Sequence, residues 1–234
     1  VVKPGDSVID LGCGPATQLG MVARFNPEVS FTGVDLSEEM LSRARDNVAE
    51  QQLGNVRFEH CDITSLDFLA DNSVDAVMST VVLHHLPDVQ ALERVFAEVK
   101  RVLKPGGGLY LVDFGHLKSE KSIEYFAYQY ADRQAELFTC DYLYSLRAAF
   151  QKDDFRRLSD RYLQGVAEMY STFVMPFMVA MKSPARGQVS DVALAEMRKF
   201  YETMPDYHKR DIADLMTFFR LGGLRSEALK RAIH

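Results

Sequence analysis

The chain has 234 residues, of which 47% are hydrophobic, and its formal net charge is −6. This length predicts one large domain or a domain with an appendage, and the apolar content is ample for a single core. The acidic balance argues against an extended nucleic-acid surface, and three cysteines are too few for a disulfide framework. No apolar run reaches membrane-spanning length, and no leader with a basic head precedes the first strand. The few, scattered cysteines lead us to expect a cytoplasmic protein.

The first half of the chain alternates apolar strands with amphipathic helices. Ser37 is suited to cap a helix that runs to about Gln51, because Glu38 and Glu39 follow it at the positive end. The pattern predicts strands at Val8–Leu11, Ser30–Asp35, Asn55–Cys61, Ser73–Thr80 and Leu109–Phe114, and further helices at 17–25 and Pro87–Leu103. Five strands with intervening helices predict right-handed crossovers and a doubly wound, mostly parallel α/β sheet.

After residue 117 the alternation ends. The sequence predicts helices at Ser122–Gln134, Leu137–Phe150, Asp153–Leu163, 190–204 and 208–221, and a hairpin of Val166–Ser171 and Phe177–Lys182 that closes the sheet edge. We therefore divide the chain into a core at 1–117, a helical lid at 118–152, a helix and hairpin that complete the sheet at 153–184, and a C-terminal helical extension at 185–234.

The motif that carries the functional argument lies near the start of the chain. The strand Val8–Leu11 runs into Gly12-Cys13-Gly14, and the next strand ends in Asp35. A glycine turn after one strand and an acid at the tip of the next is how an α/β sheet binds a nucleoside-like ligand. The glycines let the backbone approach the ligand, and Asp35 is placed to accept hydrogen bonds from a ribose diol. The alternative is a strand-to-helix turn that uses glycine only for its geometry.

The segment Asp10-x-Gly12-x-Gly14-x-Ala16 resembles the first motif of the class I S-adenosylmethionine-dependent methyltransferases. The resemblance extends over 1–117 and is closest to the small-molecule branch, with its ubiquinone-type and methyltransferase type 11-like members. Supporting segments are Gly33–Leu41, Cys61-Asp62-Ile63, Val77–Pro87 and Lys104–Gly108. Ala16 stands where many members have a third glycine.

This resemblance implies a Rossmann-like, seven-stranded sheet and transfer of a methyl group from S-adenosylmethionine to a small-molecule acceptor, with S-adenosylhomocysteine as the product. It implies neither a metal nor a nucleic-acid or membrane partner. Family members usually have helical sequence ahead of the first strand, so we also expect residues before Val1. The implied cofactor-binding residues are Asp10, Gly12, Cys13, Gly14 and Thr17 at the methionine end, Asp35 at the ribose, Leu36, Met40, Cys61, Asp62 and Ile63 at the adenine, and Ser79 and Thr80 near the sulfur.

Catalysis in such a site comes mainly from alignment of the acceptor with the methyl–sulfur bond, which supplies roughly 7–11 kcal/mol. His84 and His85 are candidates for proton transfer, with packing beside the cofactor as the alternative. Aromatic residues are dense in the predicted lid, where Tyr128 and Tyr142 are candidates for an acceptor-binding wall and helix packing is the alternative. The role of a general base stays open, because it depends on the acceptor atom.

Three other interpretations are kept. An NAD-dependent oxidoreductase would use Asp35, but the fingerprint lacks its third glycine and gives Asp10 no role. A non-catalytic S-adenosylmethionine-binding protein would keep the fold and use the lid for a partner; the helices at 190–221 also suggest a homodimer. Arsenic methylation needs several cysteines near the transfer site, whereas Cys13, Cys61 and Cys140 are scattered.

Overall fold

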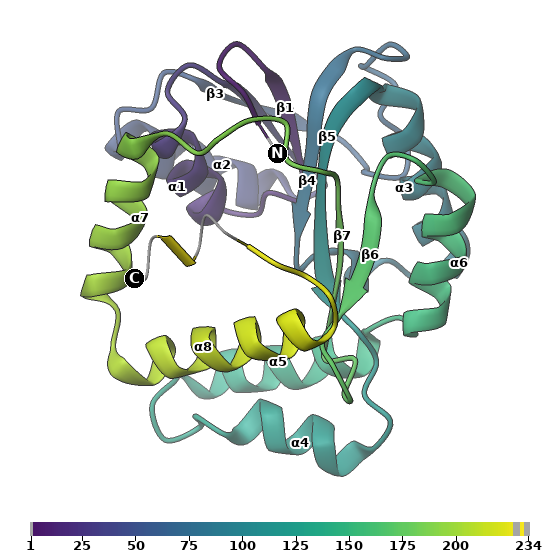
Figure 1. The fold of residues 1–234 in the computed structure, drawn as a ribbon, viewed down its shortest axis with the longest axis vertical. Coiled ribbons are helices and arrows are strands. Elements are labelled where there is room, and N and C mark those ends of the chain that lie inside the picture. Colours follow the sequence, from purple (N-terminus) through teal and green to yellow (C-terminus); the bar gives the residue numbers. More distant parts are fainter. Residues whose placement is uncertain (1, 227–229, 232–234) are drawn as a thin grey trace.

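The computed structural model describes residues 2–226 and 230–231 (Figure 1). Within them, seven strands form one sheet in the order β3-β2-β1-β4-β5-β7-β6, and only β7 runs antiparallel to its two neighbours. The strands are β1 (Ser7–Leu11), β2 (Ser30–Asp35), β3 (Val56–His60), β4 (Val74–Thr80), β5 (Leu103–Phe114), β6 (Glu168–Ser171) and β7 (Met178–Lys182). The predicted doubly wound, mostly parallel sheet and its closing hairpin are confirmed.

Helices cover both faces of the sheet because successive strand residues point to opposite sides. On one face, α3 and α6 bury Phe96 and Phe155 against alternate strand residues such as Val77. On the other face, α1 and α2 pack against Val8 and Phe31 (Figure 1). The helices are α1 (Thr17–Phe25), α2 (Glu38–Glu50), α3 (Val89–Val102), α4 (Glu120–Tyr128), α5 (Glu136–Ala148), α6 (Lys152–Tyr162), α7 (Asp191–Thr203) and α8 (Asp206–Leu221), with a short 3-10 turn η1 (Leu83–His85).

A third apolar cluster lies at the end of the sheet toward which β5 runs. There α4, α5 and α8 meet, and Phe114 and Met178 of the sheet pack with Leu143 of α5 and Phe219 of α8 (Figure 1). The segment predicted as a lid therefore covers the carboxyl-terminal ends of strands, which is where α/β proteins bind their ligands.

Several boundaries shift by one or two residues, and two differ more widely from the sequence prediction. The helix predicted to reach Gln134 ends at Tyr128, because Tyr130 turns toward α8 and its hydroxyl donates to Asp211 (2.6 Å). The strand predicted to begin at Leu109 begins at Leu103, since the glycine segment is absorbed as an irregularity in the pairing of β4 with β5. The last part of the predicted C-terminal extension, 227–229 and 232–234, lies outside the described residues.

Candidate cofactor and acceptor site

The glycine loop between β1 and α1 is tied to the neighbouring strand by its backbone. The amides of Gly12 and Cys13 both donate to the carbonyl of Val34 in β2, at 2.8 and 2.9 Å. Gly12 and Gly14 have φ of +70° and +52°, a left-handed backbone that glycine adopts without strain. A Cβ added at Gly14 would meet nothing within 4 Å, so the loop faces open space at this point.

Asp35 lies at the tip of β2 and fixes the same loop. One oxygen of its carboxylate accepts from the amide of Gly14 (2.8 Å), and the other accepts from the amide of Ser37 (2.9 Å). The Ser37 hydroxyl accepts from the amide of Met40 and caps α2, as the sequence predicts. Each carboxylate oxygen has a second lone pair, so the half-buried Asp35 keeps acceptor capacity for two hydroxyl groups.

Asp10 is 5% exposed and accepts no hydrogen bond from any of the described residues. Burial raises its pKa to about 8, and the nearby carboxylate of Asp35 adds to the shift. The same burial, together with Asp10, raises the pKa of the Cys13 thiol. The site therefore holds a carboxyl group that a cationic ligand would ionise, beside a thiol that stays protonated.

The loop after β4 is clamped against the glycine loop. Val82 lies so close to Gly12 that a Cβ there would meet its Cγ2 at 2.2 Å. The preceding Val81 has φ of +55°, a conformation that is strained for a β-branched residue. This loop must therefore be held in place by other contacts.

Asp113 of β5 supplies those contacts. Its buried carboxylate accepts from the amides of Val82 (2.8 Å) and Leu83 (2.5 Å), and Nδ1 of His84 donates to it at 2.8 Å. Sequence reasoning missed this residue. An acid inside the apolar run of the fifth strand is the signal that identifies it, because a charge is buried there only with partners.

The Ser79 hydroxyl donates to the carbonyl of Leu11 (2.9 Å) and the residue is fully buried, so this side chain joins β4 to β1. Its place near the sulfur stays a prediction. Thr80 is half-buried at the strand end, and its hydroxyl accepts from the side chain of Gln18 in α1 (3.2 Å). Gln18 is a second residue that sequence reasoning missed, while Thr17 beside it is exposed at the start of α1.

The residues predicted at the adenine follow the ends of β2 and β3. Leu36 is 66% exposed, Met40 is half-buried and Ile63 is buried. The imidazole of His60 bonds to the carbonyl of Leu36 (2.8 Å) and joins the two strand ends. One carboxylate oxygen of Asp62 accepts from the amide of Thr64 (2.8 Å), and the thiol of Cys61 donates to the carbonyl of Ser65 (3.0 Å).

The two histidines have different environments. His84 is 3% exposed, and its Nε2 has no hydrogen-bond partner among the described residues. The ring of His85 lies beside it, tilted by 42° with the ring centroids 4.1 Å apart, but reaches the surface. Loss of solvent around the His85 ring, followed by the charge of His84, lowers the pKa of His85, while Asp113, Asp141 and Asp35 act in the opposite direction.

The aromatic residues of the lid divide into two sets. Phe126 and Tyr142 point inward, with ring centroids 4.4 Å from Phe177 and 5.6 Å from Phe114 respectively. Burial raises the pKa of Tyr142, which makes its phenolate a poor candidate for a base. Tyr128 is 50% exposed. Outward-facing aromatic residues are also found on both lid helices, at Tyr125 and Tyr144.

A comparison with protein-family models matches residues 8–107 to a family described as a methyltransferase domain. This match spans less than half of the chain. The matched range holds the glycine loop, Asp35, Asp62 and the loop after β4, and it ends before the lid. The resemblance to class I S-adenosylmethionine-dependent methyltransferases of the small-molecule type is thereby confirmed.

Two curated relatives match about half of the chain. The arsenite methyltransferase of Halobacterium salinarum is 40% identical over 113 residues, which cover 48% of this chain and 28% of that protein. The demethylmenaquinone methyltransferase of Listeria monocytogenes is also 40% identical over 113 residues, covering 48% of this chain and 46% of that protein. The match thus spans less than half the length of either relative.

A solved structure supports the fold over a longer range. The crystal structure of a SAM-dependent methyltransferase from Aquifex aeolicus aligns with a TM-score of 0.55 and 17% identity, covering 78% of this chain and 84% of that chain. These methyltransferase matches give no support to an NAD-dependent oxidoreductase.

The three cysteines are free, and no group of three or more metal-ligating side chains suited to a metal ion occurs among the described residues. Across residues 2–226 and 230–231, no helix has both the length and the apolar character needed to cross a membrane.

Proposed function

We propose that this protein transfers the methyl group of S-adenosylmethionine to a small-molecule acceptor. The observation that carries the proposal is the hydrogen bond from the Gly14 amide to the Asp35 carboxylate, which fixes the glycine loop close to the buried carboxyl of Asp10. These residues lie in the range that matches the methyltransferase-domain family. S-adenosylmethionine supplies an activated methyl group on a sulfonium, so the protein needs no covalent intermediate. The residues of the protein bind the cofactor, orient the acceptor toward the methyl group and exclude water from the site.

The side chains at the ends of β1, β2 and β3 fit the ribose, adenine and methionine parts of S-adenosylmethionine. The two free lone pairs of Asp35 match a ribose diol, and the exposed Leu36 with Met40 and Ile63 offers an apolar surface for adenine. Asp62 retains acceptor capacity for the adenine amino group. The open loop at Gly14 and the raised pKa of Asp10 suit the methionine ammonium, because a nearby cation favours the carboxylate.

We assign the acceptor to the space between the loop after β4 and the lid. His85 belongs to η1, which packs against α5 of the predicted lid, and the nearby Val82 lies against Gly12 of the glycine loop, which supports a position of His85 between the two. Its lowered pKa keeps the imidazole neutral near pH 7, ready to take a proton from the acceptor. His84 is a positioning residue in this scheme, because its Nδ1 is committed to Asp113.

Features away from the site support further parts of the proposal. In the proposed division into a core at 1–117, a lid at 118–152, a closing segment at 153–184 and an extension at 185–234, the first and last divisions fall between elements, whereas Lys152 is already the first residue of α6. Exposed Val192, Phe200 and Leu221 on α7 and α8 support a homodimer through these helices.

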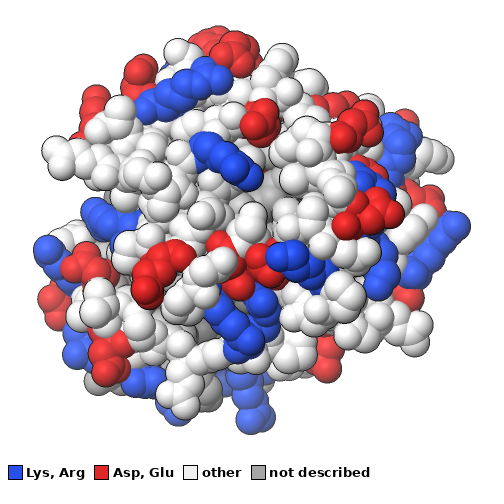
Figure 2. All heavy atoms as spheres, turned by 90° about the horizontal axis from the view of Figure 1, so that it is seen from above, with Lys and Arg blue, Asp and Glu red and all other residues white. Residues whose placement is uncertain are grey.

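Three free cysteines support a cytoplasmic location. Figure 2 shows both signs of charge interspersed on the face that it presents, which supports the absence of a nucleic-acid partner.

The proposal is tested by calorimetric titration with S-adenosylhomocysteine and by transfer of labelled methyl from S-adenosylmethionine to a metabolite extract. We expect saturable binding that Asp35→Ala weakens by at least about tenfold, because hydrogen bonds to a charged group are worth about 1.5–3 kcal/mol each. The exposed Asp46 provides a matched carboxylate on α2, and Asp46→Ala should bind like the parent protein.

A second variant separates binding from chemistry. His85→Asn should keep the affinity for S-adenosylhomocysteine and lower methyl transfer by about 10²-fold or more, the usual contribution of a general base. Absence of S-adenosylhomocysteine binding to the parent protein would overturn the proposed function. Binding without any methylated product in the extract would favour a non-catalytic role, and unchanged transfer by His85→Asn would remove that residue from the mechanism.

A further inference from the structure

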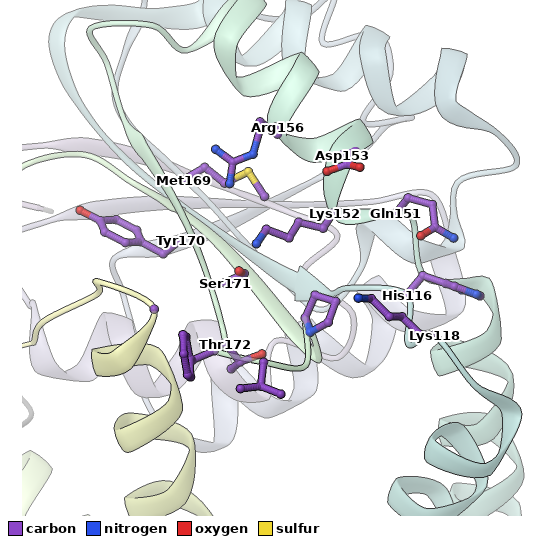
Figure 3. Close-up of a pocket in the computed structure, with 14 residues that line it drawn as sticks. His116, Lys118, Gln151, Lys152, Asp153, Arg156, Met169, Tyr170, Ser171 and Thr172 are labelled. Carbon is purple, nitrogen blue, oxygen red and sulfur yellow. The ribbon is translucent and has the colours of Figure 1, made fainter.

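A second cavity lies at the opposite edge of the sheet from the predicted cofactor residues. It has a volume of about 560 Å³ and is bounded by the segment after β5, the first turn of α6, β6 and the β6–β7 turn (Figure 3). None of the residues predicted to bind the cofactor lines it. Small-molecule sites in proteins occupy roughly 300–1,000 Å³, so this cavity is large enough for a metabolite.

The lining carries an excess of positive charge. Lys118, Lys152 and Arg156 face one carboxylate, that of Asp153, with His116 beside them. None of the three cations makes a hydrogen bond or ion pair with any described residue. Their neighbours on α6 do: Arg157 pairs with Asp154 at 3.3 Å, and Arg161 pairs with Glu93. Three cations without an ion-pair partner among the described residues therefore line one cavity.

The backbone of α6 adds to this field. The helix has 11 residues, and its N-cap residue Gln151 lines the cavity without a side-chain hydrogen bond to the first turn. The first amides of a helix carry partial positive charge and need acceptors. Figure 3 shows the Lys152 side chain extending from this turn across the cavity toward Ser171 of β6. Its charge is thereby directed at the same space as the helix start.

We propose that this cavity binds a small phosphorylated molecule. A phosphate group carries nearly two negative charges and three acceptor oxygens, which matches three cations and a helix start better than a single carboxylate does. The remaining lining includes Met169, Phe173 and Pro176, which offer an apolar surface to the body of the ligand. The site is distinct from the methyl-transfer site, so both can be occupied together.

The test is a calorimetric titration of the full chain with inorganic pyrophosphate, with and without saturating S-adenosylhomocysteine. We expect one saturable site, unaffected by S-adenosylhomocysteine. Lys152→Gln and Arg156→Gln should each weaken pyrophosphate binding by at least about tenfold, in the range expected for loss of a charge-assisted hydrogen bond. Arg157→Gln is the matched control, because Arg157 lies on the same helix but does not line the cavity, and it should bind within about twofold of the parent.

Three results would overturn the inference. They are the absence of saturable pyrophosphate binding to the parent protein, an equal loss in Arg157→Gln, and displacement of pyrophosphate by S-adenosylhomocysteine. Urea unfolding of each variant establishes that the substitution leaves the fold intact. Failure of the proposed methyl transfer would leave this outcome unchanged, because the titration does not depend on turnover.

Discussion

Asp10 is a buried carboxyl whose charge depends on what occupies the site. Because burial raises its pKa from 3.8 to about 8, the folded protein holds a proton there that the unfolded chain has released. The free energy of unfolding of the unliganded protein should therefore fall as the pH rises through this window. A ligand with an ammonium group reverses the preference, since it stabilises the carboxylate.

Binding of S-adenosylhomocysteine should accordingly strengthen with pH. We expect the association constant to rise by up to about tenfold per pH unit between pH 6 and the pKa of about 8, and then to level off. Calorimetry in buffers of different ionisation enthalpy should detect a proton released on binding at pH 7. Asp10→Asn should abolish both effects, whereas Asp46→Asn should retain them. A parent affinity that stays flat from pH 6 to 8 would show that Asp10 does not meet the ligand.

At the scale of elements, the loop after β4 depends on Asp113 of β5. That carboxylate holds two amides and one imidazole, and through Val82 it fixes the distance between this loop and the glycine loop. Loss of the carboxylate leaves several buried donors without an acceptor. Such groups cost about 1–3 kcal/mol each, more where a charge is involved.

Asp113→Ala should therefore lower the free energy of unfolding by about 3 kcal/mol or more, as measured by urea titration followed by circular dichroism. Asp160→Ala removes an exposed carboxylate from α6 and should change stability by less than about 0.5 kcal/mol. Equal midpoints for Asp113→Ala and the parent would mean that other contacts hold the strained Val81 in place.

The sequence predicts helix caps and turns correctly where they depend only on neighbouring residues. The cap at Ser37 and the glycine turn at Gly12 follow from short-range geometry, and both are present. Sequence reasoning missed features that depend on distant partners. The helix predicted to reach Gln134 ends at Tyr128, beyond which Tyr130 bonds to Asp211 of α8, and the Ser79 hydroxyl bonds to the carbonyl of Leu11. Such contacts join positions many residues apart, and no local pattern encodes them.

At the scale of the whole molecule, the residues proposed to bind the cofactor and those proposed to contact the acceptor lie in separate segments of the chain. The matched domain at residues 8–107 contains every residue assigned to the cofactor, whereas Tyr128 and Tyr142 lie beyond it. A shared fold with different lids is how related enzymes change substrate while they keep the cofactor. The two segments should therefore respond separately to mutation.

We expect Tyr128→Ala and Tyr142→Ala to raise the KM for the acceptor by about tenfold or more, with S-adenosylhomocysteine affinity within about twofold of the parent. If Tyr142→Ala loses stability, Tyr142→Phe replaces it in this test, because the phenylalanine ring keeps the packing against Phe114. The matched control is Tyr144→Ala, an exposed tyrosine on the same helix, which should leave KM unchanged. If both alanine variants turn over normally, the lid does not contact the acceptor.

The contact between Gly12 and Val82 also constrains how the chain can diverge. A methyl group at position 12 would overlap the valine, so any larger residue there requires a smaller one at position 82. Even then the φ of +70° would cost an alanine about 1 kcal/mol or more. Homologous sequences should thus show these two positions changing in concert, with glycine retained wherever a branched side chain stands opposite.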